Sequence, residues 1–365
     1  MPDDFDYSKP RLKMTTASTD FPLLTTLLVA FSVVFTASFW LQNQMPDSPV
    51  SAISHLALSS PTQVWSGSYK GLFLSIFPHA DVIHILFNML WLWRIGMAIE
   101  KEVHPLAYVG FVLASAFVGS TCELAISSQV GIGMSGVVYA MFGLVWAGRG
   151  HSAAWRQIAT RENMNLFLGW GVLCIVLTAL KYMTVANGAH FGGLLFGLCI
   201  GGLVYSPRKK LVLIPALVAQ LALCFMVLFY VPWSGNWHWF AGDRDYDARR
   251  YVKAGNHFET ALKLSGDDAP LLANLSLSYL QQMNEAENRG DEAEVKRLLQ
   301  QIDKISHKLE IMGALKREGD KGSKGGKVTT EDEATAPIPG DGKSSDSNTE
   351  KGDGGTKQET APGKQ

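Results

Sequence analysis

The chain has 365 residues, of which 47% are hydrophobic, and its formal net charge is −1. The charge is unevenly placed, because 42 of the 65 charged residues lie in the last 125 positions. This segregation, with all four cysteines in apolar runs, excludes a single soluble globular domain, a basic nucleic-acid binder and a disulfide-stabilised secreted scaffold.

Seven apolar stretches are long enough, or nearly so, to cross about 30 Å of hydrocarbon as helices. In chain order they are 23–41, 82–99, 105–126, 131–147, 164–180, 189–205 and 211–231. The first is too long for the apolar part of a signal peptide, and no small-residue cleavage site follows it. The sequence therefore predicts an all-α, polytopic membrane protein.

Lysine and arginine in the short connections predict its orientation, since they favour the cytoplasmic side. One side of the predicted spans carries Lys9, Arg11, Lys13, Arg94, Lys101, Arg149, Arg156, Arg161, Arg208, Lys209 and Lys210. The other side carries only Lys70 and Lys181. We expect a multi-pass plasma (inner) membrane protein with a cytoplasmic N-terminus and, after an odd number of spans, an extracytoplasmic C-terminal region.

Three spans that run from outside to inside open with polar residues, which are costly at membrane depth and indicate functional sites. Span 82–99 opens with His84 and Asn88, one helical turn apart. Span 131–147 opens around Ser135, and His190 lies at the start of span 189–205. In the predicted orientation, all four residues lie a few residues below the same outer surface.

This set of side chains indicates nucleophilic acyl transfer. The Ser135 hydroxyl needs a base to take its proton, and neutral His190 can do so. His84, the Asn88 amide and the backbone N–H of Ser135 can donate hydrogen bonds to the anionic oxygen of a tetrahedral intermediate. In a different mechanism, a carboxylate at Glu123 or Asp81 would orient His190.

Glycines beside these residues bear on access and packing. Gly133 and Gly136 let a substrate backbone approach Ser135 without a Cβ clash. Two stripes of small residues, which let helices approach closely, continue along the spans: Gly136, Ala140 and Gly143 on one, and Gly193, Gly197 and Gly201 on the other. Simpler explanations exist for each feature, because GxSG arises by chance and serine or histidine in a membrane helix can serve packing alone.

From about residue 71 to 205 the chain resembles the rhomboid family of intramembrane serine proteases. The resemblance rests on four patterns: His79-x4-His84-x3-Asn88, Gly96-x3-Glu100, Gly133-Met134-Ser135-Gly136-Val137-Val138-Tyr139-Ala140 and Ala189-His190-x2-Gly193-x3-Gly197. It implies a six-helix core, to which this chain adds a seventh span. It also implies cleavage of transmembrane segments of other membrane proteins near the outer surface, with no metal or cofactor.

The resemblance implies a role for each matching residue. Ser135 and His190 would form a dyad that requires no carboxylate, with His84, Asn88 and the Ser135 amide at the oxyanion site. Tyr139 would pack on the ring of His190, and His79 and Glu100 would be structural hydrogen-bonding positions. One departure is the stretch Tyr69-Lys70-Gly71, where many members carry a Trp-Arg pair.

The last third is predicted to be a soluble helical region with a disordered tail. Ala254-x3-Phe258-x2-Ala261-x4-Gly266 and Leu275-x3-Tyr279 keep the register of a tetratricopeptide repeat; a plain helical hairpin is the alternative. A single repeat and a half leaves an apolar face for a protein partner, a second copy or the membrane surface. From Glu318 the composition lacks large apolar residues and predicts disorder.

The predicted organisation is a cytoplasmic segment (1–20), a protease core (21–206), a seventh span (207–234), a helical region (241–317) and a tail (318–365). Its partners would be transmembrane substrates and the lipid bilayer, not nucleic acid. Two alternatives to a protease are a catalytically silent relative that binds transmembrane clients and a transporter. The intact Ser135 and His190 count against the first, and polar residues near one surface rather than the midplane count against the second.

Overall fold

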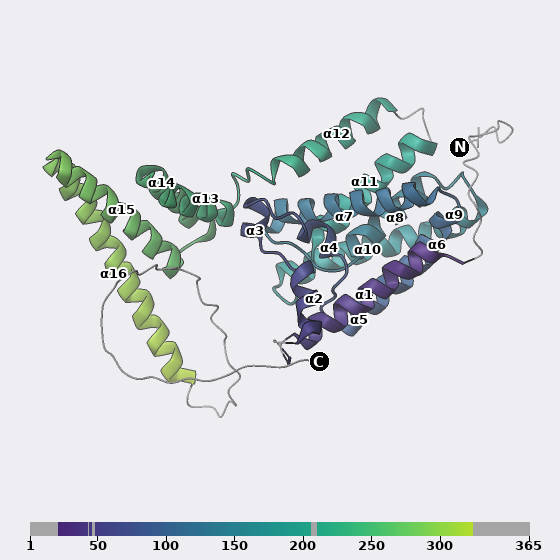
Figure 1. Ribbon diagram of the computed structural model, residues 1–365, viewed down its shortest axis with the longest axis horizontal. Coiled ribbons are helices and arrows are strands. Elements are labelled where there is room, and N and C mark those ends of the chain that lie inside the picture. The colour runs from purple at the N-terminus through teal and green to yellow at the C-terminus, as the bar shows by residue number, and fades with distance from the viewer. Residues whose placement is uncertain (1–20, 43, 46–47, 206–209, 324–365) are drawn as a thin grey trace, which may run out of the picture. The chain divides into compact units, whose positions relative to one another are not determined.

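The computed structural model describes residues 21–42, 44–45, 48–205 and 210–323. Within these ranges the regular structure is helical and contains no strand, which confirms the predicted all-α class (Figure 1). The predicted cytoplasmic segment 1–20 and most of the predicted tail lie outside the described residues. So do five basic residues used for the orientation: Lys9, Arg11, Lys13, Arg208 and Lys209.

Twelve α-helices and one π-helical turn, η1, make up the apolar part of the described chain. They are α1 (Leu23–Leu41), α2 (Pro49–Ala57), α3 (Pro61–Trp65), α4 (Gly71–Leu74), α5 (Val82–Trp91), η1 (Leu92–Gly96), α6 (Met97–Glu100), α7 (Pro105–Ser127), α8 (Ser135–Ala147), α9 (Ala153–Ile158), α10 (Arg161–Ala179), α11 (Asn187–Tyr205) and α12 (Lys210–Met226). Among the described residues, five helices are long and apolar enough to cross a membrane: α1, the continuous segment 82–100, α7, α10 and α11.

The other two predicted spans correspond to shorter apolar helices, α8 and α12. The predicted outer end of span 131–147 is wrong, because residues 131–134 are not helical. Gly133 has a φ of +106°, which a right-handed helix does not allow, and its N–H donates to the Ser75 carbonyl at 2.9 Å. Irregular backbone at membrane depth is tolerated where protein satisfies its polar groups. The predicted span 211–231 also ends early, at Met226.

Helix α8 lies at the centre of the bundle, since every residue from Gly136 to Val145 is buried. Its most extensive packing is against α11. A Cβ on Gly193 would overlap the carbonyl oxygen of Gly136, and one on Gly197 would overlap that of Ala140. The two stripes of small residues therefore face one another, and the backbones of α8 and α11 are in direct contact.

Helix α12 packs against α7 and α11. Its buried Gln220 side chain donates to the carbonyl of Gly192 on α11 at 2.7 Å. Cys224 of α12 lies in a small apolar cluster with Cys122 of α7, and both thiols are free. The seventh apolar helix is thus tied to the helix that carries His190.

Four further helices follow: α13 (Gly235–Asp247), α14 (Tyr251–Ser265), α15 (Ala269–Arg289) and α16 (Glu292–Ser323). Helix α14 packs on both α13 and α15. Leu298 and Ile305 of α16 are buried in the same apolar cluster as Phe258 of α14. Part of the face that a repeat and a half was expected to leave open is therefore covered by α16. That helix also continues past position 318, where the tail was predicted to begin.

The C-terminal helices begin in contact with the end of α7. The indole of Trp233 donates to the Ala125 carbonyl at 2.7 Å, and the Ser128 hydroxyl donates to that of Ser234 at 2.6 Å. Ser234 also caps α13 by accepting from the N–H of Trp237, which is buried against Ala125 and its neighbours. The last turn of α7 thus anchors the start of the C-terminal region.

Candidate active site

Ser135 is the first residue of α8 and follows the irregular segment 131–134. Val138 donates to the carbonyl of Met134, so the N–H of Ser135 precedes the hydrogen-bond ladder of the helix. Gly133 cannot be replaced without strain, because of its positive φ and because a Cβ there would lie 2.6 Å from His84 Nε2. The local backbone therefore presents a serine and its free amide at a helix start.

His190 is buried in the first turns of α11, with 3% of its surface exposed. Its Nε2 lies 2.8 Å from the Oγ of Ser135. If Nε2 accepts the serine proton, Nδ1 carries the ring hydrogen. Among the described residues, Nδ1 of His190 has no hydrogen-bond partner. Within the described residues, the site is therefore a Ser135–His190 pair with no third side chain bonded to the histidine.

The plane of the His190 ring is set by Tyr139, one turn after Ser135 on α8. The two rings stack with centroids 4.5 Å apart and planes inclined by 8°. The Tyr139 hydroxyl donates to the carbonyl of Phe167 on α10 at 2.8 Å, which fixes the phenol ring. Position 139 therefore orients the imidazole through an aromatic contact, the packing that the family resemblance implied.

The two carboxylates considered as partners of His190 bind elsewhere. Asp81 accepts from the N–H of His84 at 2.8 Å and caps α5. Glu123 accepts from the N–H of Gly188 at 2.8 Å and, at 3.4 Å, from that of Ala189. Neither is hydrogen-bonded to His190, so the structure does not support the three-residue alternative.

His84 and Asn88 lie beside the nucleophile segment, one turn apart on α5. His84 Nδ1 faces the N–H of Ala80 at 3.4 Å, which favours the tautomer with hydrogen on Nε2. That Nε2 faces Gly133, as the short distance to a Cβ there shows. Asn88 is buried and gives one amide hydrogen to the His84 carbonyl at 2.9 Å. The Nε2–H of His84 and the second amide hydrogen of Asn88 are left as donors.

His79 connects α1 to the nucleophile segment. Its Nε2 accepts from the N–H of Met134 at 3.2 Å, and its Nδ1 lies 3.2 Å from the Thr36 hydroxyl. Burial lowers the pKa of His79 to about 3, so the ring is neutral and Nδ1 carries its hydrogen. The sequence suggested a structural role for His79 but gave no sign of Thr36 or Met134 as its partners.

Glu100 is not brought to the dyad. It accepts from the N–H groups of Leu24 and Thr25, both at 2.8 Å, and from the Thr25 hydroxyl at 2.6 Å. The carboxylate therefore caps the first turn of α1 and links it to the end of span 82–100. The family resemblance pointed to Glu100 as a hydrogen-bonding position, but nothing in the sequence indicates its partners some 75 positions away.

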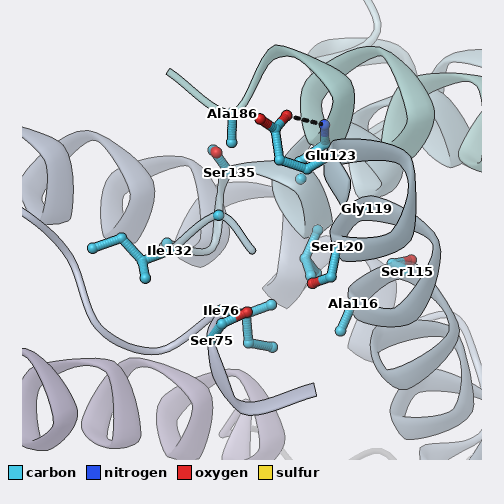
Figure 2. Close-up of a pocket in the computed structure, with 15 residues that line it drawn as sticks. Ser75, Ile76, Ser115, Ala116, Gly119, Ser120, Glu123, Ile132, Ser135 and Ala186 are labelled. Atoms are coloured by element: carbon cyan, nitrogen blue, oxygen red, sulfur yellow. Dashed lines mark hydrogen bonds between the residues drawn. The ribbon is translucent and has the colours of Figure 1, made fainter. Parts of the chain in front are cut away.

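A small cavity adjoins Ser135, and Figure 2 shows the polar groups of Ser75, Ser120 and Glu123 around it. The Ser75 hydroxyl is buried and has no partner in the described part of the chain. Ile132 and Ala186 supply apolar lining (Figure 2). The described residues contain no group of three or more His, Cys, Asp or Glu side chains placed to hold a metal ion.

Comparison with known proteins matches the part of the chain that holds this site. Residues 61–207 match the family model described as rhomboid domain. The Rhomboid protease GlpG of Salmonella paratyphi A is 35% identical over 130 residues, which cover 35% of this chain and 46% of the relative. That of Klebsiella pneumoniae subsp. pneumoniae is 34% identical over 172 residues, covering 47% and 60% respectively. The chain thus spans about half the length of the curated relatives it matches. The rhomboid match and the long apolar helices together make it a multi-pass membrane protein.

Proposed function

We propose that this chain is an intramembrane serine endopeptidase. The premise is its match to the rhomboid domain at residues 61–207. Ser135 is the nucleophile and His190 the general base. The observation that carries this proposal is the 2.8 Å separation of Ser135 Oγ from His190 Nε2 in the buried interface of α8 and α11. The relatives matched over this segment are named proteases, which supports the same activity.

In the acylation step, Ser135 Oγ attacks the carbonyl carbon of the scissile peptide bond while its proton moves to Nε2 of His190. The imidazolium that forms lies against the face of Tyr139, where a cation is favoured. His84 Nε2–H, the free amide hydrogen of Asn88 and the Ser135 N–H stabilise the oxyanion. His190 then gives its proton to the leaving amine as the peptide bond breaks.

Deacylation needs a water molecule in a site surrounded by apolar helices. The cavity beside Ser135 offers a polar position for it next to Ser75 and Ser120. His190 takes a proton from this water as it attacks the acyl-enzyme, and the proton returns to Ser135 Oγ when the ester bond breaks. The products are a carboxylic acid and a regenerated serine.

The substrates are transmembrane segments of other membrane proteins, cut near the outer surface of the plasma (inner) membrane. The placement of lysine and arginine supports a cytoplasmic N-terminus and an extracytoplasmic C-terminal region. Helices α13–α16 would recruit a protein partner or a second copy through a repeat-like surface, supported by Leu264, Leu277 and Leu299, which are all at least 47% exposed.

Two substitutions test the mechanism in vesicles that hold the purified full chain and a transmembrane substrate. Ser135→Ala and His190→Ala should each abolish cleavage and still unfold cooperatively on heating in detergent. Ser32→Ala removes another buried serine, one bonded to its own helix, and should cleave normally. Full cleavage by either dyad variant contradicts the proposed mechanism. Substrate binding without cleavage by the unmodified chain favours the silent alternative.

A further inference from the structure

Glu123 lies near the end of α7, and its side chain is almost fully enclosed, with 3% of the residue exposed. It is the single charged residue of α7. Burying a carboxylate is costly unless hydrogen bonds replace its water. The mechanism proposed above does not use it, so its presence beside the dyad needs another explanation.

The carboxylate binds the first turn of α11. It accepts the N–H of Gly188 at 2.8 Å and, at 3.4 Å, that of Ala189, the second bond being drawn in Figure 2. The first N–H groups of a helix have no partner within the helix, and a negative charge is favoured at this end. Glu123 therefore supplies from α7 the cap for the helix that carries His190.

The contact is tight as well as polar. A Cβ on Gly188 would lie 2.6 Å from the carbonyl oxygen of Cys122 and 2.8 Å from the Cα of Glu123. Ala189 fits against α8, because a Cβ on Gly136 would lie 3.2 Å from its methyl group. The turn that leads into His190 is thus held toward α7 on one side and against α8 on the other.

His190 itself has few contacts that could correct a displaced backbone. Nε2 bonds Ser135, the ring stacks on Tyr139, and Nδ1 has no partner in the described residues. In a three-residue site, a carboxylate on Nδ1 would hold the ring. Here the position of the ring depends on where the first turn of α11 lies.

We propose that Glu123 is the positioning residue of His190: it fixes the first turn of α11 so that Nε2 stays within hydrogen-bond reach of Ser135. This inference rests on the proposed function. A misplacement of about 1 Å in a catalytic group can cost about 100-fold in rate. Loss of the cap should therefore lower kcat and leave KM little changed, because a residue that acts only through the position of His190 contributes little to substrate binding.

The experiment compares the full chain with Glu123→Ala, Glu123→Gln and Glu123→Asp in vesicles with one transmembrane substrate. We expect kcat to fall about 10- to 100-fold for Ala and at least about 10-fold for Asp, whose carboxylate is one methylene short. Glu123→Gln keeps an acceptor at the same length and should stay within about threefold of the unmodified chain. KM should change less than about threefold throughout.

Reaction of Ser135 with a fluorophosphonate gives a second readout, independent of the transmembrane substrate, and should slow in parallel with kcat. The matched control is Thr121→Val on the same helix, a fully buried hydroxyl bonded to the carbonyls of Phe117 and Val118. Its kcat and labelling rate should be unchanged. If Glu123→Ala does not fold, the kcat and the labelling rate of Glu123→Asp test the inference in its place.

Three results would overturn the inference: unchanged kcat in Glu123→Asp, failure of Glu123→Gln to retain activity, or an equal loss in Thr121→Val. Each presupposes that the unmodified chain cleaves the substrate and that Ser135→Ala does not. If that condition fails, the proposed function is at fault, so the two failures can be told apart.

Discussion

The close contact of α8 and α11 predicts a large effect for Gly143→Ala. A Cβ at position 143 would lie 2.5 Å from the carbonyl oxygen of Leu194, whereas ordinary contact begins at 3.4 Å. The two backbones must therefore separate by about 0.9 Å. If the whole separation reaches the first turns, the 2.8 Å distance between Ser135 and His190 becomes about 3.7 Å, beyond the usual limit of about 3.2 Å.

Two free-energy terms oppose each other in this variant. Overpacking a buried contact costs about 1–3 kcal/mol, while replacing glycine by alanine inside a helix returns about 1 kcal/mol. We expect a net loss of stability of up to about 2 kcal/mol and, from the displaced dyad, a fall in kcat of about 100-fold. Thermal unfolding in detergent and cleavage of a reconstituted substrate measure the two effects.

Gly169→Ala on α10 is the matched control. A Cβ at position 169 meets nothing within 4 Å, so this variant gains helix propensity without a clash. It should keep its kcat and unfold at the same or a higher temperature. If Gly143→Ala matches this control in both measurements, the backbone contact does not set the distance between Ser135 and His190.

Two further predictions concern titratable groups, the buried His79 and the half-buried Asp243. His79→Leu removes the acceptor of the Met134 N–H. Because an unpaired buried N–H costs about 1–3 kcal/mol of stability, the segment before Ser135 should shift, and this misplacement should lower kcat by about 10-fold or more. Thr36→Val leaves that bond intact and should lose less activity; equal losses would contradict the reasoning. Burial raises the pKa of Asp243 to about 6 from 3.8, so its contribution to stability is full below pH 3.8 and is lost as the pH rises through about 6. Asp243→Asn can still accept the hydrogen bond from Asn274 and should remove this loss of stability at higher pH. Hydrogen exchange of α13–α15 at about pH 4 and 7, corrected for intrinsic exchange rates, measures the change. If the variant keeps the pH dependence of the unmodified chain, the prediction is refuted.

The positions of the apolar helices could be predicted from sequence because a lipid environment demands long apolar runs. The predicted span 23–41 has the same bounds as α1. The outer end of span 131–147 could not be predicted in this way. Its backbone conformation is set by tertiary contacts of Gly133 with Ser75 and His84, which hydropathy does not register.

The proximity of Ser135 and His190 could be anticipated from their shared depth and from the small residues that follow each of them. The family resemblance also pointed to the packing of Tyr139 on His190, but the contacts that fix Tyr139 and the first turn of α11 could not be anticipated. The Tyr139 hydroxyl bonds a carbonyl 28 positions away, and Glu123 bonds an N–H 65 positions away. The one available signal was a lone carboxylate in an apolar helix, which indicates that a partner exists but does not identify it.

The shortness of α8 restricts which transmembrane segments the proposed protease can cut. Thirteen residues extend about 20 Å, about 10 Å less than the hydrocarbon thickness. If the proposed orientation holds and the C-terminal end of α8 lies at the cytoplasmic boundary, Ser135 lies about 10 Å below the outer edge, a depth that about seven residues of a substrate helix traverse. Those two turns must unwind before a peptide bond can reach Ser135, and each backbone group left unpaired in lipid costs several kcal/mol. The helix stability of a substrate's outer two turns, more than the residue at the cut, would then determine which membrane proteins are cleaved.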